Sequence, residues 1–165
     1  MAQHTDFSSI EQFESTLRAE MSAFHDFNEL LQAEKIALAS DEIDRLADLA
    51  QLKTEKVLQL SQLAEQRNLF LAAHSCLPDQ PGMEEWCRRT RGQLGQRIHT
   101  LWQGMLDEAR RAHRQNQENG VLIELKLEHN QQALNVIKTA ANQQGVYGPD
   151  GKTLAAHPGR PIGKV

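Results

Sequence analysis

Residues 10–38 read IEQFESTLRAEMSAFHDFNELLQAEKIAL, and this stretch decides the fold of the first part of the chain. Its apolar side chains recur at intervals of three and four residues, which average close to 3.5, the repeat of a coiled-coil seam. These positions are Ile10, Phe13, Leu17, Met21, Phe24, Phe27, Leu31 and Leu38. Ser8 and Glu11 have the spacing of a capping box, so the pattern predicts a helix over about 9–38.

A second helix is predicted immediately after the first. Ser40 and Asp41 can accept the free amide hydrogens of a helix start, and Asp44 suits the helix dipole, so this helix should run over about 41–74. Its apolar positions are Ile43, Leu46, Leu49, Ala50, Val57, Leu60, Leu63, Ala64, Phe70 and Leu71. Two helices of similar length joined by a few residues must pack antiparallel.

Pro78, Pro81 and Gly82 end this hairpin, and a third helix is predicted over about 83–118. Asn119-Gly120 is a common helix stop, so a fourth antiparallel helix is predicted over about 121–142. One continuous, kinked helix is the alternative, because no capping residue follows Gly120. The fold class is therefore all-α: an elongated antiparallel bundle of three to four long helices with coiled-coil-like packing, over residues 1–144.

The C-terminal residues 145–165 have a different composition. Gly, Pro, His and single charges alternate there without an apolar period, which predicts a flexible, disordered tail. A Tyr-Gly-Pro-Asp-Gly motif with turn chemistry begins at Tyr147. This tyrosine is either an incidental aromatic residue in the tail or a short motif whose ring docks on a partner.

Composition limits the classes of partner. The 165-residue chain has a formal net charge of −4, and its Lys and Arg residues form no run that would favour nucleic acid. No apolar run approaches the length of a membrane span. The N-terminal sequence MAQHTDFSS lacks the basic and apolar regions of a signal peptide, so we expect a cytoplasmic protein without membrane insertion.

The sequence gives little support for an enzyme or a cofactor site. Cys76, Cys87 and His74 do not have a standard zinc spacing, and we expect free thiols and no metal. The chain has no Glu-x-x-His pair, phosphate-binding glycine loop, Gly-x-Ser-x-Gly elbow or Cys-x-x-Cys pair. We therefore expect no catalytic residues and no cofactor.

The segment 121–141 is unusually apolar. Val121, Leu122, Leu125, Ala133, Val136 and Ala140 are assigned to one side of a helical wheel, and Ile123, Leu127, Leu134, Ile137 and Ala141 to the adjoining side. Together they cover roughly 240° of the circumference, whereas a helix docked on one bundle face needs somewhat more than about 100°. Either the helix is enclosed by its own bundle or dimer, or part of its apolar surface awaits a partner. Polar residues inside this arc, such as Lys126, argue against full enclosure.

Several motifs resemble those of one family. The weaker ones are Leu30-Leu31-x-x-Glu34-x-x-Ala37-Leu38, Glu55-Lys56 and Arg67. The more specific ones are Trp102, Asn116-x-x-Asn119-Gly120-x-Leu122, Asn130-Gln131-Gln132-Ala133-Leu134 and Tyr147-Gly148-x-Asp150-Gly151. In this combination, the chain resembles the FlgN-type flagellar export chaperones, which serve a type III secretion apparatus.

The resemblance implies that the C-terminal helix binds C-terminal helical segments of hook–filament junction proteins in the cytoplasm and prevents their premature assembly. Together with the over-wide arc, it places client binding on Leu122, Leu125, Leu127, Leu134 and Ile137. It also implies that Tyr147 docks on the cytoplasmic domain of the export gate. Pro149 departs from the family pattern and stiffens the turn. A homodimer is a further expectation for the client-free protein. A structural coiled-coil module without client specificity is the alternative function.

Overall fold

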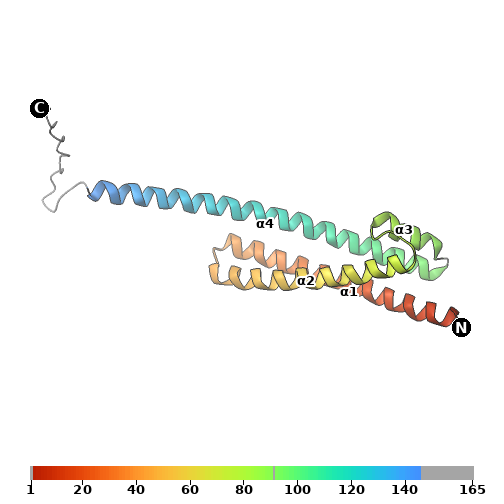
Figure 1. The fold of residues 1–165 in the computed structure, drawn as a ribbon. Coiled ribbons are helices and arrows are strands. Elements are labelled where there is room, and N and C mark those ends of the chain that lie inside the picture. The colour runs from red at the N-terminus through yellow and green to blue at the C-terminus, as the bar shows by residue number, and fades with distance from the viewer. Residues whose placement is uncertain (1, 91, 146–165) are drawn as a thin grey trace, which may run out of the picture. The chain divides into compact units, whose positions relative to one another are not determined.

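The computed structural model describes residues 2–90 and 92–145, and the side chains of residues 9–90 and 92–142. It contains four helices: α1 (Ala2–Ala39), α2 (Ile43–Ala73), α3 (Gln80–Arg89) and α4 (Gln93–Gly145). Figure 1 shows them in chain order from red to blue. The described residues form no strand, so the all-α class predicted from the sequence is confirmed.

Ion pairs and hydrogen bonds show the helix directions. On α2, Lys56 contacts Asp26 and Lys53 contacts Glu34, so the residue numbers of the two helices run in opposite directions, as predicted. On α4, Arg97 contacts Glu14, and Glu118 accepts a hydrogen bond from Lys35. Up to residue 122, α4 therefore runs parallel to α1 and antiparallel to α2 (Figure 1).

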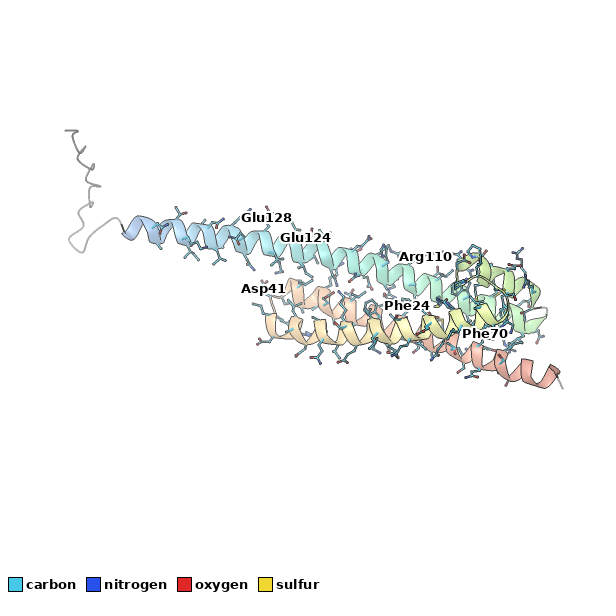
Figure 2. The ribbon with its side chains drawn as sticks, viewed as in Figure 1. Phe24, Asp41, Phe70, Arg110, Glu124 and Glu128 are labelled. Atoms are coloured by element: carbon cyan, nitrogen blue, oxygen red, sulfur yellow. The ribbon has the colours of Figure 1, made fainter. Side chains whose placement is uncertain are left out.

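Two groups of buried side chains hold these helices together. The first lies where α3 packs on the other helices, and Phe13 and Phe70 stack within it with ring centroids 3.8 Å apart. The ring of Trp86 on α3 is steeply inclined to both of these rings, with centroid distances of 5.2 Å to Phe13 and 5.3 Å to Phe70. Figure 2 labels Phe70 on the part of α2 beside α3. The second group consists of Ala23, Phe27, Leu31, Leu60 and Ala112.

The predicted third helix, 83–118, is wrong in its boundaries. Two helices occupy this region, because α3 ends at Arg89 and α4 begins at Gln93. Thr90 has extended backbone angles, and Gly92 has a φ of 87° that glycine adopts without strain. The first helix also begins earlier than predicted, at Ala2, so Ser8 does not cap its start.

The predicted helix break at Asn119-Gly120 is also wrong, because α4 continues through both residues. The Asn119 side chain is completely buried and is occupied by contacts with α1, so it does not form a helix end. Glycine inside a helix costs only about 1 kcal/mol relative to alanine, a penalty that packing against α1 can offset. The alternative of a continuous helix is therefore the one observed, and no fourth antiparallel helix begins at residue 121.

The structure divides into two compact units, residues 1–122 and residues 123–165. The described part of the second unit is the C-terminal segment of α4, residues 123–145. The predicted tail after residue 145 and its Tyr147 motif lie outside the described residues, so the domain boundary near residue 144 remains a prediction.

Candidate functional site

The C-terminal segment of α4 exposes large apolar side chains along its length. Four of the five residues predicted to bind a client lie here and are exposed, with relative accessibilities of 57% for Leu125, 64% for Leu127, 50% for Leu134 and 63% for Ile137. The fifth, Leu122, belongs to the first unit and is partly buried. Large apolar side chains exposed together in this way are typical of an interaction site.

The exposed apolar residues of this segment form two separate stripes. At about 100° per residue, Ile123, Leu127, Leu134 and Ile137 fall within one stripe of roughly 80°. Leu125 and Val136 lie roughly 160° and 140° from Ile123 around the helix, toward its opposite side. The large apolar side chains of both stripes are exposed.

Charged residues lie between the stripes. Glu124 and Glu128 are one helical turn apart and project from the same side of α4 (Figure 2). This segment can therefore stay hydrated along its charged edges while its stripes remain available to apolar side chains of a partner. We refer to residues 123–142 of α4 as the exposed α4 segment.

A buried polar contact fixes α4 to α1 just before this segment. The Asn119 amide donates hydrogen bonds to the backbone oxygen of Leu31 at 2.8 Å and to Oε2 of Glu34 at 2.7 Å. The ammonium group of Lys53, on α2, contacts the same carboxylate at 2.9 Å. One carboxylate thus joins all three long helices, and the first turns of the exposed α4 segment follow directly in sequence.

A second buried polar cluster surrounds Arg67 of α2. Its guanidinium group pairs with Glu20 of α1 and lies 5.2 Å from the ring centroid of Trp102 on α4. Burial of the Glu20 carboxyl raises its pKa above the ordinary value, while the positive charge of Arg67 opposes this shift. Arg67 and Trp102 are both among the residues that resemble the family in sequence, and in the structure they belong to one cluster.

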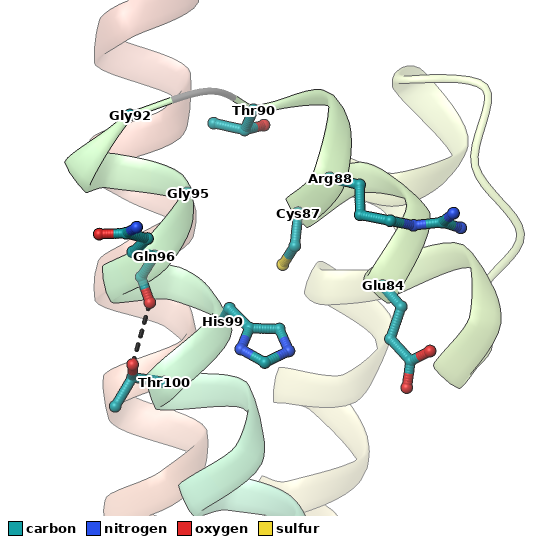
Figure 3. Close-up of a pocket in the computed structure, with 9 residues that line it drawn as sticks. All are labelled: Glu84, Cys87, Arg88, Thr90, Gly92, Gly95, Gln96, His99 and Thr100. Atoms are coloured by element: carbon teal, nitrogen blue, oxygen red, sulfur yellow. Dashed lines mark hydrogen bonds between the residues drawn. The ribbon is translucent and has the colours of Figure 1, made fainter.

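A hollow of about 660 Å³ lies between α3 and the first turns of α4. Cys87 and His99 line it from the two helices, and Gly92 and Gly95 leave room at its edge (Figure 3). Burial of the Cys87 thiol, with a smaller effect from Glu84, raises its pKa to about 11. At neutral pH this thiol is protonated, a state unsuited to a nucleophile or a metal ligand.

In the part of the chain that the structure describes, no group of three or more His, Cys, Asp or Glu side chains is placed to hold a metal ion. None of its helices is both long enough and apolar enough to cross a membrane. Tyr147, the predicted gate-docking residue, lies beyond the described residues.

Known proteins resemble this chain over most of its length. The sequence profile of the FlgN protein family matches residues 1–155. The flagella synthesis protein FlgN of Salmonella typhimurium is 33% identical over 101 residues, which are 61% of this chain and 69% of that protein. Its counterpart in Yersinia enterocolitica is 43% identical over 63 residues, which are 38% of this chain and 42% of that protein. No solved structure matches the chain significantly. Because the profile covers residues 1–155 of 165, this chain belongs to the FlgN family.

Proposed function

We propose that this protein is a cytoplasmic chaperone for flagellar type III export, without enzymatic activity. Its exposed α4 segment binds the C-terminal helical segments of hook–filament junction proteins and keeps them unassembled. Tyr147 then docks the complex on the cytoplasmic domain of the export gate. The observation that carries the proposal is the apolar surface of the exposed α4 segment, in a chain of the FlgN family.

The physical argument is that a helix exposing two apolar stripes gains stability by burying them. An isolated helix is marginal in water, and helices in proteins depend mainly on packing of their apolar faces. Amphipathic helices of a client supply such a surface by laying apolar positions at i, i+3, i+4 and i+7 against it. One client helix cannot cover both stripes, so we propose that two helical segments of the client contact opposite sides of this helix.

Client binding is tested by calorimetric titration of purified junction-protein segments against the full chain. We expect Leu134→Ala and Ile137→Ala to weaken binding by about 2 kcal/mol, or roughly 30-fold. Ile36→Ala on α1 is the matched control, because Ile36 has a relative accessibility of 49%, against 50% for Leu134. Unchanged affinity in folded Leu134→Ala and Ile137→Ala variants would reject this surface.

Leu125→Ala tests the two-sided arrangement. If clients contact only the stripe that contains Leu134, then Leu125→Ala binds like the wild type and the two-segment arrangement is wrong. A loss of affinity similar to that of Leu134→Ala is expected.

Gate docking is tested separately with Tyr147→Ala. Removing the aromatic ring should weaken binding to the purified gate domain and reduce secretion, while client affinity stays unchanged. The two sites are joined by one chain, so simultaneous engagement raises the concentration of client at the gate. Loss of client binding in Tyr147→Ala would instead assign the tyrosine to the client site.

A further inference from the structure

The outer face of α2, away from the core, carries exposed apolar side chains. Leu58 and Leu69 have relative accessibilities of 61% and 64%, whereas Leu60 and Leu71 of the same helix are buried. Leu58 and Leu69 are separated by three helical turns and lie within about 20° of each other around the helix. They therefore mark one continuous face of the first unit, distinct from the exposed α4 segment.

A groove of about 510 Å³ lies on this face. Its α2 residues are spaced at i, i+3, i+4, i+7, i+8 and i+11, which is one side of a helix. They are Ser61, Ala64, Glu65, Asn68, Leu69 and Ala72. Pro78, in the loop after α2, also lines it. We call this feature the outer α2 groove. Small side chains at three of these positions leave room for the ridge of a second helix.

The basic and acidic side chains of α2 differ in their ion pairing. All four of its basic side chains are held in ion pairs: Arg45 with Glu42, Lys53 with Glu34, Lys56 with Asp26, and Arg67 with Glu20. Its carboxylates at Asp44, Asp48, Glu55 and Glu65 have no ion pair with any residue that the structure describes. Glu65 lies in the groove wall itself. The surface available on this face is therefore apolar and negatively charged.

We propose that the outer α2 groove is a docking site for a basic amphipathic helix of a partner protein. Apolar side chains of that helix would contact Leu58 and Leu69, and its Lys or Arg side chains would face Glu65 and the neighbouring carboxylates. A second copy of this chain fits poorly, because the same acidic faces would oppose one another. Nucleic acid is repelled by the same carboxylates. The proposal does not depend on the client function of the exposed α4 segment.

The test uses the full chain and a fluorescein-labelled helical peptide with Leu at every third or fourth position and Lys at its polar positions. A second peptide carries Glu in place of each Lys. Fluorescence anisotropy should show that the Lys peptide binds at least about tenfold more tightly than the Glu peptide, and that added salt weakens its binding. Equal binding of the two peptides would overturn the proposal.

Three groove variants locate the bound peptide. Leu69→Ala removes the apolar contact, Glu65→Lys reverses the charge, and Ser61→Trp fills the groove while adding apolar surface. Each should weaken binding of the Lys peptide by about tenfold, equivalent to about 1.4 kcal/mol. The matched controls, Ile36→Ala and Glu11→Lys, make similar changes at exposed positions of α1 and should leave affinity within about twofold. Leu134→Ala and Glu124→Lys test whether the peptide binds the exposed α4 segment instead.

The alternatives give different results. Equal losses in Leu134→Ala or Glu124→Lys, or none in the groove variants, would place the peptide elsewhere and reject the groove. Sedimentation velocity tests whether a second copy of this chain occupies the groove. If the wild type is a dimer and Ser61→Trp is a monomer, the groove is a self-association site and the proposed partner helix is rejected. Circular dichroism melting confirms that each variant is folded.

Discussion

Asn119 donates a hydrogen bond to the buried carboxylate of Glu34, at 2.7 Å, although 85 residues separate them in the sequence. Glu34 belongs to the Leu-Leu-x-x-Glu-x-x-Ala-Leu motif of α1, and Asn119 to the Asn-x-x-Asn-Gly motif of α4. Two motifs that each resemble the family, and that lie far apart in the sequence, therefore meet at one contact. This contact aligns the part of α4 up to residue 122 on α1.

The first prediction concerns this contact. Asn119→Ala should lower the free energy of unfolding by about 2 kcal/mol, because a hydrogen bond to a charged group is lost and Glu34 stays buried. Urea denaturation measures the change. Asn116→Ala is the matched control, since Asn116 is exposed on the same helix and should change stability by less than about 0.5 kcal/mol. Similar effects of both substitutions would show that Asn119 has no special structural role.

The second prediction concerns Arg67. Arg67→Ala should lower the free energy of unfolding by about 3–5 kcal/mol, because Glu20 would remain buried without its cationic partner and Trp102 would lose its stacking cation. Arg110→Ala is the control, because Arg110 pairs with Asp107 at the surface and both side chains are exposed. Thermal or urea unfolding of the two variants compares them. A loss below about 1 kcal/mol for Arg67→Ala would contradict the structural role of the pair.

The third prediction concerns pH. Burial raises the pKa of Glu20 above its ordinary value of 4.5, so the folded protein binds more protons than the unfolded chain between those two pKa values. This contribution to stability is present at low pH and is lost as pH rises through the folded pKa. Glu20→Gln removes it. The free energy of unfolding of the wild type should therefore fall relative to Glu20→Gln as pH rises from about 4 to 7.

Glu118 supplies a control of opposite sign. A hydrogen bond from Lys35 lowers the pKa of Glu118, so its contribution is present above the ordinary glutamate pKa and is lost as pH falls. The wild type should therefore gain stability relative to Glu118→Gln as pH rises. Urea midpoints measured across the same pH range compare the two variants. If the wild type gains stability with rising pH relative to both variants, the raised pKa assigned to Glu20 is contradicted.

Periodicity predicted much of the fold correctly. On α2 the apolar pattern is right at Leu49, Leu60 and Leu71, which are buried, and wrong at Ile43 and Val57, which are exposed. The seam of α1 is a local pattern, and the short turn between α1 and α2 forces these helices to pack antiparallel. These inferences succeeded because they depend on residues that are close in sequence.

The errors arose where distant residues decide the conformation. Asn119-Gly120 has the composition of a helix stop, but contacts with Leu31 and Glu34 on α1 keep it helical. Such contacts cannot be read from local sequence. The end of α3 was missed because the chain turns through Thr90 and Gly92 without a proline, between apolar positions that continue in helical spacing. The outer α2 groove was missed because small residues such as Ser61 and Ala72 give no apolar signal.

The last prediction tests the continuity of α4 with two glycines of the same helix. Gly120 has no atom within 4 Å of a built Cβ atom and no positive φ. Gly120→Ala should therefore raise the free energy of unfolding by about 0.5–1 kcal/mol, because alanine favours a helix interior. At Gly95, a Cβ atom would lie 1.9 Å from the backbone oxygen of Thr90, so the backbone must shift. Gly95→Ala should lower stability by about 1–3 kcal/mol.

The sign of the Gly120→Ala effect is the informative result. If the chain broke after Asn119 with Gly120 in a left-handed helix cap, alanine would be strained and would destabilise the protein by about 1 kcal/mol. In a continuous helix the same substitution stabilises it. Urea denaturation of both glycine variants, with helix content followed by circular dichroism, separates these cases. If Gly120→Ala destabilises the protein, the helix breaks at this position after all. For one helix that begins against Thr90 and continues through residue 120, we expect Gly120→Ala to raise the free energy of unfolding and Gly95→Ala to lower it.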